Sequence, residues 1–89
     1  MSNIREIISN NLIELRKNNN LTQKKFADMI NYSDKAVSRW EKGEVIPDVE
    51  TLQTIADVFG ISISSLLEAK DDQTEKSENF QIKKNDLLS

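Results

Sequence analysis

The sequence contains no cysteine and no histidine. Without cysteine the chain can form neither disulfide bonds nor thiolate metal sites. Without histidine it lacks the commonest general base and metal ligand. Its acidic residues are not arranged in a recognisable acid/base pair. We therefore expect no metal ion, no cofactor and no enzymatic activity.

Long apolar segments are also missing. No run approaches the roughly 20 residues that a membrane-spanning helix needs, and residues 1–5 do not have the pattern of a signal peptide. We therefore expect a cytoplasmic protein that does not bind a membrane. With 89 residues, the chain has room for one compact domain and little else.

Charge is unevenly distributed along the chain. Residues 1–45 carry 8 basic and 6 acidic side chains (net +2), whereas residues 46–89 carry 4 basic and 9 acidic side chains (net −5). The total of −3 is unusual for a protein that binds nucleic acid. However, salt screens charges within about 10 Å, so the local field of the first half matters more than the total.

Apolar residues recur at helical spacing in five segments, which predicts helices over residues 4–18, from 23 to about 31, from 34 to about 40, 49–59 and 63–67. Thr22, Ser33, Asp48 and Ser62 are suitable N-caps for the last four. The residues expected to face the core are Ile4, Ile7, Ile8, Leu12, Leu15, Phe26, Ala27, Ile30, Ala36, Val37, Trp40, Val49, Leu52, Ile55, Ala56, Phe59, Ile63, Leu66 and Leu67.

Only about three residues separate the second predicted helix from the third. This spacing suits two helices that cross at a steep angle, as in a helix-turn-helix. If Val37 and Trp40 face inward, the third helix presents Asp34, Lys35, Ser38 and Arg39 outward. A helix fits the major groove of B-DNA, where its first residues reach base edges.

Three segments carry a family resemblance: residues 22–27 (TQKKFA), 32–43 (YSDKAVSRWEKG) and 47–52 (PDVETL). In this order and spacing they resemble the Cro/C1-type (XRE) helix-turn-helix family, which includes the lambdoid phage repressors. The resemblance covers residues 4–68. It implies an all-α, compact bundle of five helices and a DNA-binding domain over residues 1–68.

The resemblance also implies roles for individual residues. Gln23 would bind a phosphate and support the recognition helix, Lys42 would contact the DNA backbone, and Arg16 and Glu41 would form a structural ion pair. Asp34 has two alternative roles. Its carboxylate would accept a hydrogen bond from cytosine, or its negative charge would stabilise the N-terminus of the third helix. We favour the second role. The full set of residues expected to bind DNA is Thr22, Gln23, Lys24, Ser33, Asp34, Lys35, Ser38, Arg39 and Lys42.

The sequence departs from the family pattern in two places, one residue and one loop. Asn31 stands where glycine is usual, and asparagine tolerates the left-handed conformation better than most residues. Glu44, Val45 and Ile46 occupy a loop that is often basic. The absence of a basic side chain at 44–46 argues against contacts of this loop with phosphate.

The sequence therefore predicts a transcriptional repressor that binds a double-stranded DNA operator as a homodimer. An antitoxin-type regulator is a close alternative. A protein-interaction adaptor that has lost DNA binding is another, favoured by the acidic charge and by Glu44. A repressor is preferred to the adaptor because Lys35, Ser38 and Arg39 are retained.

Residues 69–89 are predicted to form a separate polar tail. The segment 70–78 is too polar to bury a face, which predicts a flexible or solvated extension. Phe80, Ile82, Leu87 and Leu88 follow without a decisive period. They leave two alternatives: a disordered end, or a segment that binds a second copy or a protein partner.

Overall fold

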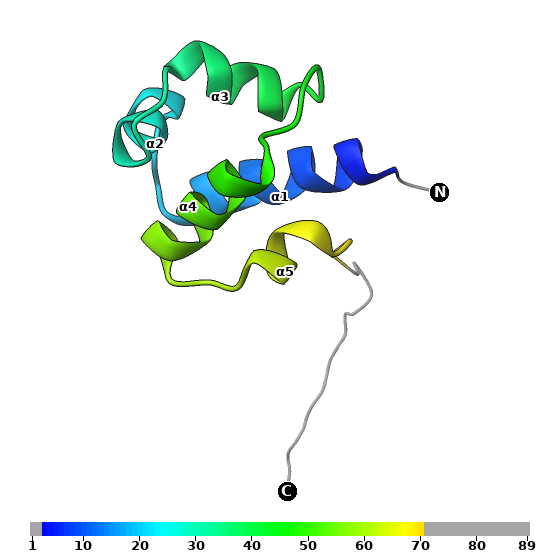
Figure 1. Cartoon of the computed structure of the whole chain (residues 1–89). Helices are drawn as coiled ribbons and strands as arrows, with labels where there is room; N and C mark the ends of the chain where they lie inside the picture. Colours follow the sequence, from blue (N-terminus) through cyan, green and yellow to red (C-terminus); the bar gives the residue numbers. More distant parts are fainter. Residues whose placement is uncertain (1–2, 71–89) are drawn as a thin grey trace, which may run out of the picture.

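Five capping side chains set where the helices begin. The computed structural model describes residues 3–70. Its helices are α1 (Ile4–Asn18), α2 (Gln23–Met29), α3 (Asp34–Glu41), α4 (Val49–Phe59) and α5 (Ile63–Leu67) (Figure 1). Each is preceded by a residue whose side chain accepts a hydrogen bond from a backbone amide of the first turn, namely Asn3, Thr22, Ser33, Asp48 and Ser62. The predicted all-α, five-helix fold is confirmed.

Residues in the left-handed conformation stop the helices and turn the chain. Asn31, two residues after the end of α2, has a φ of 62°, and Gly60, directly after α4, has a φ of 68°. At the first turn the amide of Tyr32 donates to the carbonyl of Ala27, 2.9 Å away. Such a closed turn lets α3 begin only a few residues after α2 ends.

All five helices contribute to one apolar core. Phe26, Leu12, Ile55, Leu66 and Val37 are its largest fully buried side chains. The ring of Phe26 stacks on that of Phe59 with centroids 5.2 Å apart. Helix α1 packs against α3 on one side and α5 on the other, while α2 packs against α3 (Figure 1). The core thereby holds α3 by one side only.

Three predicted core residues lie at the surface instead. Ile4 is 49% exposed, Val49 is 73% exposed and Leu67 is 38% exposed. Each is the first or last residue of its helix. The apolar face of a helix continues to its ends, but the neighbouring helices do not reach far enough to cover these residues. The predicted tail lies outside the described residues from residue 71 onward.

Candidate nucleic-acid interface

The turn between α2 and α3 orients α3 so that its apolar side meets the core. Val37 is fully buried and Trp40 is only 5% exposed. The Trp40 ring packs at a tilt against the Tyr32 ring of the turn, with centroids 5.2 Å apart. The opposite side of α3 faces away from the bundle (Figure 1).

This outer side of α3 carries the residues predicted to face DNA. Lys35 and Arg39 are exposed, Ser38 is half-buried, and Asp34 is the first residue of the helix. Ser33 caps the helix by accepting from a backbone amide at 3.1 Å. Within residues 3–70, neither Lys35 nor Arg39 forms a side-chain hydrogen bond or ion pair. Their donors are therefore available to a ligand.

The beginning of α2 carries three more of the predicted residues. The Thr22 hydroxyl oxygen accepts from the Lys25 amide at 3.0 Å, so its hydrogen remains for another acceptor. Lys24 lies 3.2 Å from the Asp28 carboxylate, with both side chains more than half exposed. Exposed pairs of this kind are weak, so a phosphate could compete for Lys24. Gln23 is half-buried.

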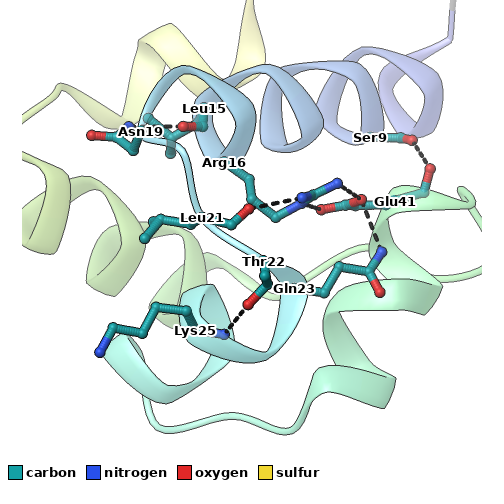
Figure 2. Close-up of polar contacts among 9 residues, drawn as sticks. All are labelled: Ser9, Leu15, Arg16, Asn19, Leu21, Thr22, Gln23, Lys25 and Glu41. Atoms are coloured by element: carbon teal, nitrogen blue, oxygen red, sulfur yellow. Dashed lines mark hydrogen bonds and ion pairs between the residues drawn. The ribbon is translucent and has the colours of Figure 1, made fainter.

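Glu41, the last residue of α3, is the centre of a polar clamp formed with Arg16 and Gln23 (Figure 2). The Nε of Arg16 lies 2.6 Å from Oε2 of Glu41, and Nη2 lies 3.1 Å from Oε1. The remaining arm of the guanidinium donates to the Leu21 carbonyl at 2.9 Å. Nε2 of Gln23 donates to Oε1 of Glu41 at 3.0 Å. This clamp ties α1 and α2 to the end of α3.

The ion pair of the polar clamp is largely buried. The side chains of Arg16 and Glu41 are only 16% and 7% exposed. The hydrogen bond with Glu41 raises the pKa of Arg16, against the opposing effect of burial. Ser9 adds a contact by donating to the backbone carbonyl of Glu41 at 2.6 Å. Because Gln23 uses one amide hydrogen on Glu41, its second hydrogen remains for a phosphate.

The chain leaves α3 through Lys42 and Gly43. Lys42 is exposed and directly follows the helix, where the resemblance implies a contact with the DNA backbone. Gly43 has a φ of 75°, a conformation that side chains rarely adopt. Next along the chain, the carbonyl of Glu44 accepts a hydrogen bond from Arg5 Nη1 at 2.9 Å.

Several positioning contacts were not predicted from the sequence, including those of Arg5 and Ser9 described above. Asn11 is 3% exposed and donates to the carbonyls of Leu66 and Glu68, at 2.8 and 2.9 Å, which ties the end of α5 to α1. A polar residue on the apolar side of the first predicted helix was the available signal. The hydroxyls of Tyr32 and Thr51 lie 2.6 Å apart and join the α2–α3 turn to α4. No local sequence pattern predicts this contact.

The described residues contain no group of three or more His, Cys, Asp or Glu that could hold a metal ion. In the same part of the chain, no helix has both the length and the apolar character needed to cross a membrane. The outer side of α3, where Lys35 and Arg39 have no side-chain partner within residues 3–70, is flanked by the start of α2 and by Lys42.

Comparisons with known proteins agree with this geometry. The chain is 37% identical over 60 residues to the HTH-type transcriptional activator BcrR of Enterococcus faecalis, covering 67% of this chain and 29% of that protein. It is 33% identical over 67 residues to the uncharacterized HTH-type transcriptional regulator YqaE of Bacillus subtilis (strain 168), covering 75% of this chain and 58% of that one. The chain thus spans less than two thirds of either relative.

A similar solved structure is the P22 c2 repressor in complex with a synthetic operator. It superimposes with a TM-score of 0.65 and 25% identity, covering 71% of this chain and 96% of the repressor chain. The sequence profile of the family HTH_3, described as helix-turn-helix, matches residues 12–66. Because this match covers more than half of the sequence, the chain belongs to the Cro/C1-type helix-turn-helix family.

Proposed function

We propose that this protein is a sequence-specific transcriptional regulator that reads double-stranded DNA with the outer side of α3. One observation carries the proposal: α3 is fixed on its inner side by Val37 and Trp40, while Lys35 and Arg39 on its outer side have no side-chain partner within residues 3–70. An α-helix with its side chains is about 10–12 Å in diameter, which suits insertion into a major groove about 12 Å wide.

The residues expected to bind DNA divide into three groups by their role. Lys35, Ser38 and Arg39 contact base edges, with Arg39 placed to donate two hydrogen bonds to a guanine. Asp34 interacts favourably with the N-terminus of α3. The residues that contact backbone phosphates are Thr22, Gln23, Lys24, Ser33 and Lys42, and they lie at the start of α2 and at the two ends of α3. Phosphate contacts set the register, and base contacts set the sequence preference.

Two copies bind one operator in this proposal. A single helix-turn-helix unit buries little DNA surface, and family members pair on two-fold operators with half-site centres about one helical turn, roughly 34 Å, apart. The P22 c2 repressor, which shares this fold, is bound to a synthetic operator in its solved structure.

We further propose repression as the direction of regulation and the cytoplasm as the location. A protein that occupies an operator blocks other proteins from the same DNA without needing an additional activity. BcrR is described as an activator, so the same DNA-binding unit can be used in either direction. A reporter gene fused to the operator measures the direction, since repression lowers its expression in the presence of the protein.

The deciding experiment is selection of bound duplexes from a random pool. We expect enrichment of a two-fold symmetric motif whose half-sites lie about one helical turn apart. The matched control carries Lys35→Ala, Ser38→Ala and Arg39→Ala, which change only the outer side of α3. Enrichment of the same motif by this variant, or of no motif by the parent, would contradict the proposal.

A further inference from the structure

The loop that follows α3 has little capacity of its own to bind a phosphate. Lys42 is followed by an acidic residue, Glu44, and two apolar residues. The backbone amides of residues 42, 43 and 44 donate to carbonyls of α3 at 3.0, 3.1 and 3.0 Å. These three amides therefore cannot donate to a phosphate. A positive group that would assist Lys42 at this end of α3 has to come from another part of the chain.

Arg5, in the first turn of α1, provides such a cation. Its Nη1 donates to the Glu44 carbonyl at 2.9 Å across 39 positions of sequence. A side chain at Gly43 would meet the Arg5 stem, because an added Cβ would lie 3.9 Å from the Arg5 Cγ. The stem and one arm of the guanidinium are thus held against the loop. A guanidinium has five N–H donors, so this hydrogen bond leaves most of them unused.

Arg5 and Lys42 line the same open hollow, which has a volume of about 190 Å³. Its other lining residues are Asn3, Glu6, Ser9 and Gly43. Asn3 is engaged with the Glu6 amide, and the Ser9 hydroxyl donates to the Glu41 carbonyl. With two cations and one carboxylate, the lining has a net charge of +1. Within residues 3–70, its side-chain donors without a full set of partners belong to Arg5, Lys42 and the Asn3 amide, and only the first two carry a positive charge.

We propose that Arg5, together with Lys42, binds a backbone phosphate of the DNA at the C-terminal end of α3. This inference rests on the proposed function and adds a contact from α1. Arg5 compensates for the missing basic charge of the α3–α4 loop. Its hydrogen bond to Glu44 holds the guanidinium in place before DNA arrives, which reduces the entropy lost on binding.

The test is the salt dependence of DNA affinity for the full chain and for Arg5→Ala. Each phosphate neutralised contributes about 0.9 to the slope of log affinity against log salt. We expect the slope for Arg5→Ala to be smaller in magnitude by about 0.9 for each bound copy, on the selected site and on unrelated duplex alike. For each bound copy, the affinity advantage of the parent should then shrink about 3.5-fold between 50 and 200 mM salt.

Two further variants separate a phosphate contact from a structural role. Lys70→Ala removes the same charge from the end of the described chain, where Lys70 lies 3.5 Å from Glu14, and should leave the slope unchanged. Arg5→Lys keeps the charge and should retain most of the slope. If Arg5→Ala and Arg5→Lys both bind more weakly with the slope of the parent, Arg5 is only a tether and the inference is wrong.

A modified DNA locates the contact. Replacing the symmetry-related phosphates of the two half-sites, one pair at a time, by uncharged methylphosphonates should reveal one pair of positions at which the parent and Arg5→Ala bind equally well. The absence of any such pair would overturn the inference. Failure of the proposed function is a separate result: the parent would show no preference for any sequence, while its slope on unrelated duplex would still report whether Arg5 contacts a phosphate.

Discussion

The two sides of α3 differ in how their polar groups are used. On the inner side, Glu41 is nearly buried and accepts three side-chain hydrogen bonds from Arg16 and Gln23. On the outer side, Lys35 and Arg39 are exposed and form no side-chain hydrogen bond within residues 3–70. Buried polar groups must be paired within the protein, whereas exposed polar groups can remain without a protein partner until a ligand binds. We therefore expect substitutions on the inner side of α3 to change stability and substitutions on its outer side to change DNA binding.

The largest effect on stability is expected from the polar clamp. Arg16→Ala should lower the free energy of unfolding by about 3 kcal/mol, because it leaves the nearly buried carboxylate of Glu41 without its cation. The double variant with Glu41→Ala should lose less than the two single losses combined. Denaturant unfolding of all four proteins gives the coupling energy. Lys24→Ala, in an exposed pair, is the control and should cost less than about 0.5 kcal/mol. A coupling energy of zero would show that the clamp does not act as a unit.

The outer side should show the opposite behaviour. Arg39→Ala should weaken binding to the selected site by about 1–3 kcal/mol and relax the preference for guanine at one position of the site. The free energy of unfolding should change by less than about 0.5 kcal/mol, since Arg39 is exposed. Titration of the selected and scrambled duplexes, with unfolding measured in parallel, checks both parts. Equal affinity of parent and variant for the selected site would remove Arg39 from the interface.

A substitution in the turn between α2 and α3 should have a smaller effect on stability. Asn31 has a φ of 62°, where most side chains are strained. Asn31→Ala should therefore lower the free energy of unfolding by about 1 kcal/mol. Asn31→Gly, the residue usual at this position in the family, is the matched control and should be at least as stable as the alanine variant. Greater stability of the alanine variant would mean that strain at this turn is unimportant.

The smallest effect concerns the start of α4. Hydrogen bonds from the side chain and backbone of Thr51 hold the pKa of Asp48 below its ordinary value. The folded state therefore favours the charged form, so this stabilisation is present above the pKa of the unfolded chain and is lost as the pH falls through the folded pKa. Asp48→Asn keeps a capping oxygen but does not titrate.

The stability advantage of Asp48 over Asp48→Asn should decrease as the pH is lowered from about 6 to about 3. Denaturant unfolding of both proteins across this range measures the difference. An advantage that stays constant, or that grows toward acid, would contradict the assignment of Asp48 as a charged cap.

The local features of the fold could be predicted because they depend on neighbouring residues. Thr22, Ser33, Asp48 and Ser62 cap helices as expected, since a cap bonds an amide only three residues away. The positive φ of Asn31 agrees with the family pattern, in which glycine is usual at this position. The inward positions of Val37 and Trp40 followed from helical spacing, and they in turn defined the outer side of α3.

Other features depended on which elements meet. The exposure of Ile4, Val49 and Leu67 could not be predicted from spacing, because spacing gives the side of a helix but not the extent of its neighbours. Asn11 is buried only because the end of α5 supplies two carbonyls, 55 and 57 positions away in sequence. Arg5 reaches the α3–α4 loop only because α1 begins beside it.

Local sequence patterns were therefore enough to predict the five helices, the caps of the last four and the side of α3 that faces solvent, because hydrogen bonds and helical periodicity act over a few residues. Tertiary structure alone decided the partners of Asn11 and Arg5 and the fate of the apolar helix ends. These depend on distances between segments far apart in the chain, which no local pattern records.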